Sequence, residues 1–337
     1  MNTSLDPIDF ALVNDWQRGF PLVSRPYAAL ARRLGLPESA VIARLEHLIA
    51  QGTVSRVGAV FRPHTLGWST LAAVSVPADR LMAVAEIING YPEVNHNYER
   101  EHEFNLWFVA TAPHREQVTQ VLTEIGRAAN SLVLDLPMLE SFHIDLGFDL
   151  RRQARPRAPH LDPVRRPQES LVPPSLESAD YALAGALEAG LALTARPYAR
   201  LAASLGVSEA AVLDRLARLL DLGVIRRFGV VVRHHELGYA ANAMVVWDVP
   251  DAAVAEIGRM LAQQAAVTLC YRRPRRLPAW RYNLFSMVHG QDRQAVSTEI
   301  ARMRSELGLE HVACEALFSR RRFKQCGARY SGWVQAA

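Results

Sequence analysis

The sequence predicts an α/β (α+β) fold built by tandem duplication, in which each copy joins a winged helix-turn-helix domain to a ferredoxin-like βαββαβ domain. The duplication is directly visible, because RPYAALARRLGLPESAV from Arg25 aligns without a gap with RPYARLAASLGVSEAAV from Arg196. In both copies, two short helical segments come first, and alternating strands and helices follow. We therefore expect two related halves that pair as a pseudo-dimer within one chain. The sequence leaves open whether two such chains also form a homodimer.

Each copy opens with a predicted helix-turn-helix. In the first copy, residues 25–34 and 37–51 carry apolar residues at helical spacing, with Gly35 in the turn and Gly52 after the second helix. The segment 53–61 and its equivalent in the second copy are rich in β-branched residues and end near a turn. They predict a short strand in the place of a wing.

The rest of each copy predicts the ferredoxin-like domain. In the first copy, LAAVSVP is expected to form a strand, ADRLMAVAEIINGYP a helix, EVNHNYER and FNLWFVAT a hairpin, HREQVTQVLTEIGRAA a helix and LESFHIDLGF a last strand. A segment rich in proline and arginine separates the copies and predicts an extended linker. The expected boundaries are 1–65 and 177–237 for the winged helix-turn-helix domains, 66–150 and 238–337 for the ferredoxin-like domains, and 151–176 for the linker.

Composition narrows the class of protein. With 337 residues, of which 50% are hydrophobic and 21% charged, the chain can bury several domain cores, which excludes a disordered protein. The formal net charge is +4, and Lys324 is the only lysine, so nearly all basic side chains are arginines, which suit carboxylate or phosphate binding. Three cysteines without a C-x-x-C motif argue against a metal cluster and for a reducing compartment. Because there is no secretory leader or long apolar run, we expect a cytoplasmic protein without a membrane partner.

The run LPESAVIARLEHLIAQGTV, followed by a small α/β domain, resembles the Lrp/AsnC regulators, and the resemblance covers both copies. It implies the architecture and does not settle the activity. A regulator would need a recognition helix that offers cations and amides to the major groove. Acidic residues offset the basic ones along both candidate helices, and we expect Arg44 and Arg215 to form structural ion pairs. A DNA-binding transcription regulator is therefore the alternative, and nucleic acid is not an expected partner.

A second resemblance lies in the ferredoxin-like domains. The motifs NHNYERE, FNLWF and ESFHI, with LCYRRP, YNLFS and RRFKQ in the second copy, resemble the sirohaem decarboxylases, and the tandem arrangement is similar to their fused two-subunit form from the haem d1 pathway. The resemblance implies conversion of sirohaem to 12,18-didecarboxysirohaem by loss of CO₂ from two acetate side chains, in haem d1 or alternative haem biosynthesis. It implies a carboxy-lyase that requires no cofactor, since sirohaem, an iron tetrapyrrole, is itself the substrate. A non-catalytic haem- or sirohaem-binding sensor would use the same pocket.

The candidate catalytic residues are His96, Arg100, His143 and Lys324. His96 alternates with Tyr98 and Arg100 along a predicted strand, which places the three side chains on one face of the sheet. The ordinary pKa of histidine suits delivery of a proton to the new methyl group near neutral pH. His143 and Lys324 occupy equivalent places in the two copies. The second copy has Leu269 where the first has His96, so the halves are expected to be non-equivalent.

The substrate carries eight carboxylates, so several arginines should converge on one pocket. An insertion of the type RPRRLPAW in the second copy supplies most of the candidates beside Arg100. Tyr98 and Tyr271 are candidates for hydrogen bonds to carboxylates, and Trp107 is either a core residue or a wall for the macrocycle. An axial ligand to the substrate iron stays open among His64, His96, His143, His234 and His235, and no separate metal site is expected. The remaining candidate substrate-binding residues are Arg272, Arg273, Arg275, Arg276 and Arg281.

Overall fold

The computed structural model describes residues 5–62, 65–144, 175–232 and 241–329. They form two compact units, and both copies contribute to each unit. One contains the described residues up to Leu66 and those of 175–232, and we call it the helix-turn-helix unit. The other contains the described residues of 67–144 and 241–329, and we call it the sheet unit. Within these ranges, no helix combines the length and the apolar character needed to cross a membrane.

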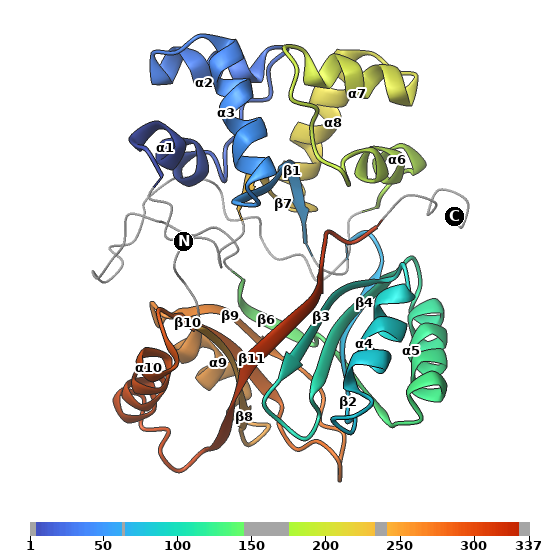
Figure 1. The fold of residues 1–337 in the computed structure, drawn as a ribbon, viewed down its shortest axis with the longest axis vertical. Helices are drawn as coiled ribbons and strands as arrows, with labels where there is room; N and C mark the ends of the chain where they lie inside the picture. The colour runs from blue at the N-terminus through green and yellow to red at the C-terminus, as the bar shows by residue number, and fades with distance from the viewer. Residues whose placement is uncertain (1–4, 63–64, 145–174, 233–240, 330–337) are drawn as a thin grey trace. The chain divides into compact units, whose positions relative to one another are not determined.

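Each copy contributes three helices to the helix-turn-helix unit, one more than the sequence predicts. Gly35 and Gly206 end the second helix of each set with φ of 67°, a left-handed conformation that glycine adopts without strain. The helices are α1 (Pro7–Asp15), α2 (Pro26–Leu34) and α3 (Glu38–Ala50) in the first copy, and α6 (Ser178–Ala186), α7 (Pro197–Leu205) and α8 (Glu209–Asp221) in the second (Figure 1).

The strands predicted as wings are present, but they pair between the copies. β1 (Val54–Phe61) and β7 (Ile225–Val232) form a two-stranded antiparallel sheet with Gly58 opposite Gly229. A single strand has unpaired backbone groups along its edge, and the equivalent strand of the other copy satisfies them. In the described structure, the wing strand of each copy is therefore paired with that of the other copy.

The expected ion pairs of the helix-turn-helix unit are confirmed. The Arg44 guanidinium on α3 lies 2.6 Å from the Asp6 carboxylate and 2.8 Å from that of Asp9 at the start of α1. Arg215 on α8 lies 2.6 Å from the buried Asp180 on α6. Both arginines of the candidate recognition helices are thus bound to carboxylates of the same copy.

The sheet unit contains one nine-stranded sheet in the order β5-β2-β4-β3-β11-β8-β10-β9-β6. Both copies contain the βαββαβ order, which confirms the ferredoxin-like fold, and the first copy has one strand more than predicted. The first copy supplies β2 (Trp68–Val74), α4 (Leu81–Gly90), β3 (Val94–Arg100), β4 (Leu106–Ala112), α5 (Arg115–Ala129), β5 (Val133–Pro137) and β6 (Glu140–Ile144); the second supplies β8 (Ala241–Asp248), α9 (Val254–Ala262), β9 (Val267–Arg272), β10 (Leu284–Gly290), α10 (Arg293–Glu306) and β11 (Ala313–Gln325).

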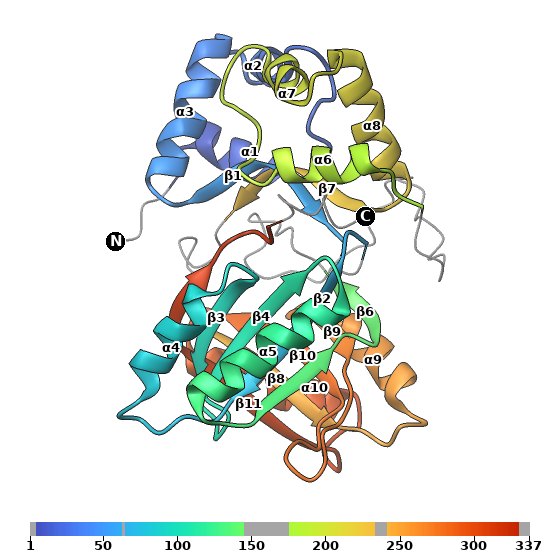
Figure 2. The same ribbon diagram turned by 90° about the vertical axis from the view of Figure 1, so that its right-hand side faces the viewer.

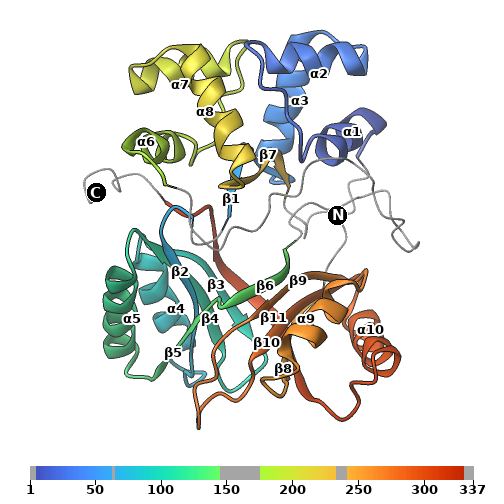
Figure 3. The same cartoon turned by 180° about the vertical axis from the view of Figure 1, so that it is seen from behind.

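The last strand of each copy crosses into the other copy. Residues 313–318 of β11 pair with β8, and residues 319–325 of the same strand pair with β3 of the first copy. In the first copy, β5 pairs with β2, and β6 pairs with β9 of the second copy (Figure 3). The sequence predicted β6 as the last strand of the first domain and missed β5, which occupies that place. These crossing strands bring residues of both copies to the same part of the sheet.

Each half of the sheet has an outer face covered by helices and an inner face. Helices α4 and α5 cover the strands of the first copy, and α9 and α10 cover those of the second (Figures 1 and 2). The inner faces share one apolar cluster, which we call the inner cluster and which joins the copies. It comprises Leu71, Ala73, Phe104, Trp107, Leu134, Leu136, Met244, Val246, Trp280, Tyr282, Phe285 and Leu317.

Candidate active site

Three of the candidate residues lie together on the inner face of β3. His96 pairs in register with Val109 and Tyr98 with Trp107, and both partners pack in or against the inner cluster. The rings of His96 and Tyr98 are stacked with their centroids 6.3 Å apart, and the Arg100 guanidinium carbon lies 5.8 Å from the Tyr98 centroid. The alternation along the strand therefore places the three side chains as expected, and we call them the first half-site.

His96 is half-buried, and its surroundings determine which ring nitrogen carries the proton and how far its pKa is shifted. Nδ1 lies 2.5 Å from the amide oxygen of Asn95, which can only accept a hydrogen bond, so Nδ1 carries the proton and Nε2 is left as the basic nitrogen. Desolvation lowers the pKa of His96 to about 4. The side chain is therefore neutral at pH 7, whereas the sequence suggested a histidine that titrates near neutrality.

Arg100 is a buried cation without an acidic partner. Only 8% of it is exposed, and its Nη1 donates a hydrogen bond of 3.0 Å to the carbonyl oxygen of Leu317 in the second copy. Burial lowers its pKa to about 10, so it stays charged at neutral pH. Within the described ranges it forms no ion pair. A buried charge without a counterion is costly, and a carboxylate ligand would compensate it.

The second copy repeats this arrangement with one change. Arg273, also 8% exposed, lies over the Tyr271 ring with its guanidinium carbon 4.5 Å from the centroid, and its Nη1 donates to the carbonyl oxygen of Leu136. Its Nε is buried without a hydrogen-bond partner in the described structure, and burial lowers its pKa. Leu269 stands in the place of His96. We call Leu269, Tyr271 and Arg273 the second half-site.

The other four candidate arginines differ from Arg100 and Arg273, because each of them lies near an aspartate. They make ion pairs that hold the insertion of the second copy: Arg275 and Arg281 with Asp248, Arg272 with Asp251 at 3.8 Å, and Arg276 with Asp135 at 3.8 Å. Their acidic partners neutralise them, so they offer less to an anionic ligand than the two buried arginines do.

The same insertion places an aromatic side chain in the inner cluster. Trp280 is 1% exposed, and its ring lies 5.2 Å from that of Trp107 and 6.1 Å from that of Phe104, centroid to centroid. Trp107 is equally buried, and its indole nitrogen donates to the carbonyl oxygen of Phe104 at 2.6 Å. Of the two interpretations of Trp107, the structure therefore places it in the core and gives it no exposed face for a macrocycle.

Lys324 and His143 do not join His96. Lys324 pairs in register with Asn97, whose amide donates to α4, and its ammonium group donates to the carbonyl oxygens of Asn89 and Tyr91 at 2.8 and 3.0 Å. It therefore holds the end of α4 on the outer face. His143 is opposite Cys270, whose thiol donates to the carbonyl oxygen of Gly258 in α9.

Two polar residues near the first half-site were missed from the sequence. Arg322 and Gln325 on β11 pair in register with Tyr98 and His96. Only the crossing of β11 into the first copy makes them neighbours, and no local pattern in the sequence indicates that pairing. Of the other histidines considered for the substrate iron, His64, His234 and His235 lie outside the described residues.

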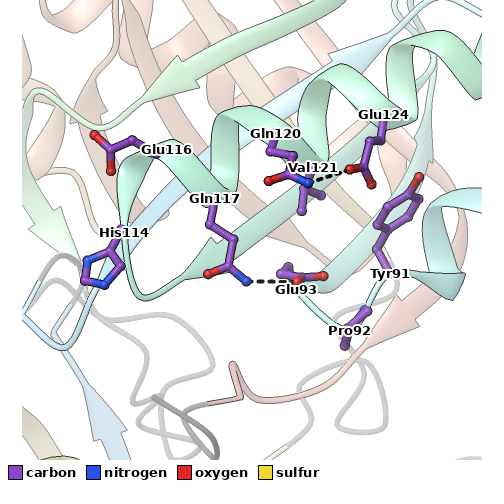
Figure 4. A pocket seen from close by; sticks show the side chains of 9 residues that line it. All are labelled: Tyr91, Pro92, Glu93, His114, Glu116, Gln117, Gln120, Val121 and Glu124. Atoms are coloured by element: carbon purple, nitrogen blue, oxygen red, sulfur yellow. Dashed lines mark hydrogen bonds between the residues drawn. The ribbon is translucent and has the colours of Figure 1, made fainter. Parts of the chain in front are cut away.

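A pocket of about 610 Å³ lies elsewhere, along α5 and the segment before β3 (Figure 4). Gln117 donates to Glu93 at 3.3 Å and Gln120 to Glu124 at 2.9 Å, and Glu116 adds a third carboxylate. Three carboxylates would repel a ligand that carries many of its own. The pocket is therefore not a candidate site for the polyanionic substrate that the sequence predicts.

Comparisons with known proteins identify both kinds of domain. The AsnC-like ligand binding domain family matches residues 65–143 and 236–324, and the siroheme decarboxylase NirDL-like HTH domain family matches residues 9–54 and 180–226. The fold and site thus define a duplicated protein of the AsnC-like ligand-binding class.

The relatives identify the family more closely. The chain is 43% identical over 330 residues to a siroheme decarboxylase NirDL subunit of Paracoccus denitrificans, which covers 96% of this chain and 98% of that one. The crystal structure of the siroheme decarboxylase NirDL in co-complex with an iron-uroporphyrin III analogue matches with a TM-score of 0.69 and 27% identity, over 98% of this chain and 95% of that one. A siroheme decarboxylase NirL subunit of Stutzerimonas stutzeri is 54% identical over 145 residues, 43% of this chain and 85% of that one. The chain belongs to the sirohaem decarboxylase family.

Proposed function

We propose that this chain converts sirohaem to 12,18-didecarboxysirohaem by removing CO₂ from two acetate side chains, in haem d1 or alternative haem synthesis. One observation carries the proposal most directly. Arg100 and Arg273 are buried arginines without an ion pair in the described structure, and they lie in equivalent half-sites on the inner faces. Such a pair suits a ligand with several carboxylates. Sirohaem, on which the sirohaem decarboxylases act, is a ligand of this kind.

The two arginines hold carboxylates of the substrate that do not react. A guanidinium stabilises a carboxylate most strongly while the carboxylate keeps its charge, and the reacting acetate must lose that charge as CO₂ departs. Tyr98 and Tyr271, each beside one of the arginines, donate further hydrogen bonds. Binding therefore fixes the orientation of the macrocycle before the chemical step.

The reaction breaks the bond between the methylene carbon and the carboxylate carbon of an acetate. CO₂ leaves, the electron pair of the bond stays on the methylene carbon, and the conjugated macrocycle delocalises it, so we propose no separate cofactor. One proton then converts this carbon into a methyl group. Each of the two steps thus consumes one proton and releases one CO₂.

His96 supplies that proton in our proposal. Its Nε2 is the free nitrogen, and with a pKa of about 4 it is unprotonated in the unliganded chain at pH 7. A substrate that brings several carboxylates close to the ring raises this pKa, because nearby negative charge favours the imidazolium form. His96 therefore becomes charged when the substrate binds and can then act as the acid.

Cysteine chemistry supports a reducing compartment. Cys270, Cys314 and Cys326 are free thiols. We propose a cytoplasmic location, where such thiols persist, and a functional pseudo-dimer in which one chain supplies both half-sites.

Anaerobic incubation of the purified chain with sirohaem tests the function. The product mass should show two successive losses of CO₂, and protein denatured beforehand should leave the mass unchanged. Tight binding of sirohaem with an unchanged mass would overturn the decarboxylase and favour a sensor.

A further inference from the structure

We propose that Arg322, on the crossing strand of the second copy, binds a carboxylate of the substrate in the first half-site. This inference rests on the proposed function, and it adds a specificity-determining residue to it. The first half-site is then built from both copies, with His96, Tyr98 and Arg100 on β3 and Arg322 on β11.

The strand register places Arg322 on the required face. β11 runs antiparallel to β3, with register shifts between Ser319 and Arg321 and between Arg322 and Lys324. In this ladder Ser319 is opposite Arg100, Arg322 opposite Tyr98 and Gln325 opposite His96. Side chains that lie directly opposite each other on antiparallel strands share a face, with Cβ atoms about 4.5–5.5 Å apart. Arg322 is therefore a neighbour of Tyr98 on the inner face.

The Arg322 guanidinium is available for a ligand. It is exposed, and its Nη1 donates one hydrogen bond of 3.0 Å to the Oε1 of Gln325. It forms no ion pair with any carboxylate in the described part of the chain. The two arginines that precede it in the chain do form ion pairs: Arg320 lies 3.5 Å from Glu101, and Arg321 lies 3.8 Å from Glu99.

The charge of Arg322 is close enough to act on the Tyr98 hydroxyl. Burial raises the pKa of the Tyr98 hydroxyl, and the charges of Arg100 and Arg322 oppose that rise. Two guanidinium groups thus act on the Tyr98 hydroxyl, one from the same strand, β3, and one from the neighbouring strand, β11. A carboxylate next to Tyr98 would meet both charges and a hydrogen-bond donor.

The second half-site has a serine where the first half-site has this cation. Ser141 of β6 is opposite Tyr271, in the place that Arg322 occupies opposite Tyr98. The crossing strands therefore distinguish the half-sites, and Arg322 determines where an additional carboxylate is held. Because a guanidinium stabilises the ionised carboxylate, Arg322 holds one that does not react and acts on binding more than on the chemical step.

The experiment compares Arg322→Ser, which copies Ser141, with Arg321→Ser, which removes the same charge from the paired neighbour. Iron uroporphyrin III serves as the binding probe in an absorbance titration, and sirohaem provides KM and kcat. Loss of one charge-assisted contact should raise Kd and KM by about tenfold for Arg322→Ser, with kcat changed by less than about threefold. Arg321→Ser should change Kd and KM by less than about twofold. Arg322→Gln replaces the serine variant if circular dichroism shows that the latter is unfolded.

Two results would overturn the inference: an unchanged Kd for Arg322→Ser, or an equal rise for both variants, which would indicate a general effect of charge. The outcome is separable from the proposed function. A parent chain that binds iron uroporphyrin III without decarboxylating sirohaem would contradict the function, while the titration would still decide the role of Arg322.

Discussion

The two half-sites have the same anion-binding side chains, but only one of them has a side chain that can deliver a proton. Each has a tyrosine and a buried arginine that donates to a backbone carbonyl of the other copy, Leu317 for Arg100 and Leu136 for Arg273. Only the first has an imidazole, since Leu269 replaces His96 in the second. Among the six residues that make up the two half-sites, only His96 has an imidazole, which allows binding and proton transfer to be tested separately.

Replacing His96 by leucine gives the first half-site the side chain of the second, and the largest effect is expected here. Loss of the proton donor should lower kcat for sirohaem by about a hundredfold or more. The Kd for iron uroporphyrin III should rise by no more than about tenfold, because the only binding energy lost is that of the charge which His96 gains when the ligand binds. Leu269→Val, a small change at the equivalent position, is the matched control and should keep the parent's kcat. A kcat within about threefold of the parent for His96→Leu would remove His96 from the mechanism.

The insertion that distinguishes the copies should contribute strongly to stability through Trp280. Truncation of this buried ring in Trp280→Ala should lower the free energy of unfolding by about 3–5 kcal/mol, since it leaves a cavity between the copies. Leu277 belongs to the same insertion and is 70% exposed, so Leu277→Ala should cost less than about 0.5 kcal/mol. Urea unfolding of both variants measures the difference. Equal losses would show that the inner cluster does not depend on the insertion.

His96 should also make the stability of the chain depend on pH. Its pKa is about 4 in the folded chain and about 6.5 when unfolded, so below pH 6.5 the unfolded state binds more protons. The free energy of unfolding should therefore fall by about 2 kcal/mol from pH 7 to pH 5 on account of His96 alone. Urea titrations at both pH values should show that His96→Leu loses this part of the decrease. The same decrease in parent and variant would contradict the low pKa.

The smallest effect in this series concerns the anchor of the second half-site. Arg273→Met removes a buried cation but keeps an apolar side chain of similar length, so it should raise the Kd for iron uroporphyrin III by about tenfold. The free energy of unfolding should fall by less than about 1 kcal/mol, because the desolvation cost of the charge disappears with it. Arg281→Met, at an exposed arginine paired with Asp248, is the control and should leave Kd unchanged. An unchanged Kd for Arg273→Met would leave the second half-site without a role in binding.

Local patterns predicted much of the fold and part of the site. The repeat and the helical spacing identified the domains, and strand alternation placed His96, Tyr98 and Arg100 on one face. The crossing of β6 and β11 was not predictable, because the sequence of a strand does not specify which edge it joins. For the same reason Arg322 was missed.

The arginines of the insertion show a second limit. Their charge suggested that they bind the substrate. In the folded chain they pair with Asp135, Asp248 and Asp251. No motif in the sequence indicates that these aspartates are their partners. Conversely, the sequence does not reveal that Arg100 and Arg273 lack such partners in the described structure. Burial and pairing, which separate the anchors from the structural ion pairs, are properties of the folded chain.

The most direct test of the account is the product mass after an anaerobic incubation just long enough for the parent to consume its sirohaem, carried out with the parent, with His96→Leu and with Leu269→Val. We predict loss of two CO₂ with the parent and with Leu269→Val, and unchanged sirohaem with His96→Leu even though that variant still binds iron uroporphyrin III. Loss of one or two CO₂ with His96→Leu would contradict the claim that the first half-site supplies the proton for both steps.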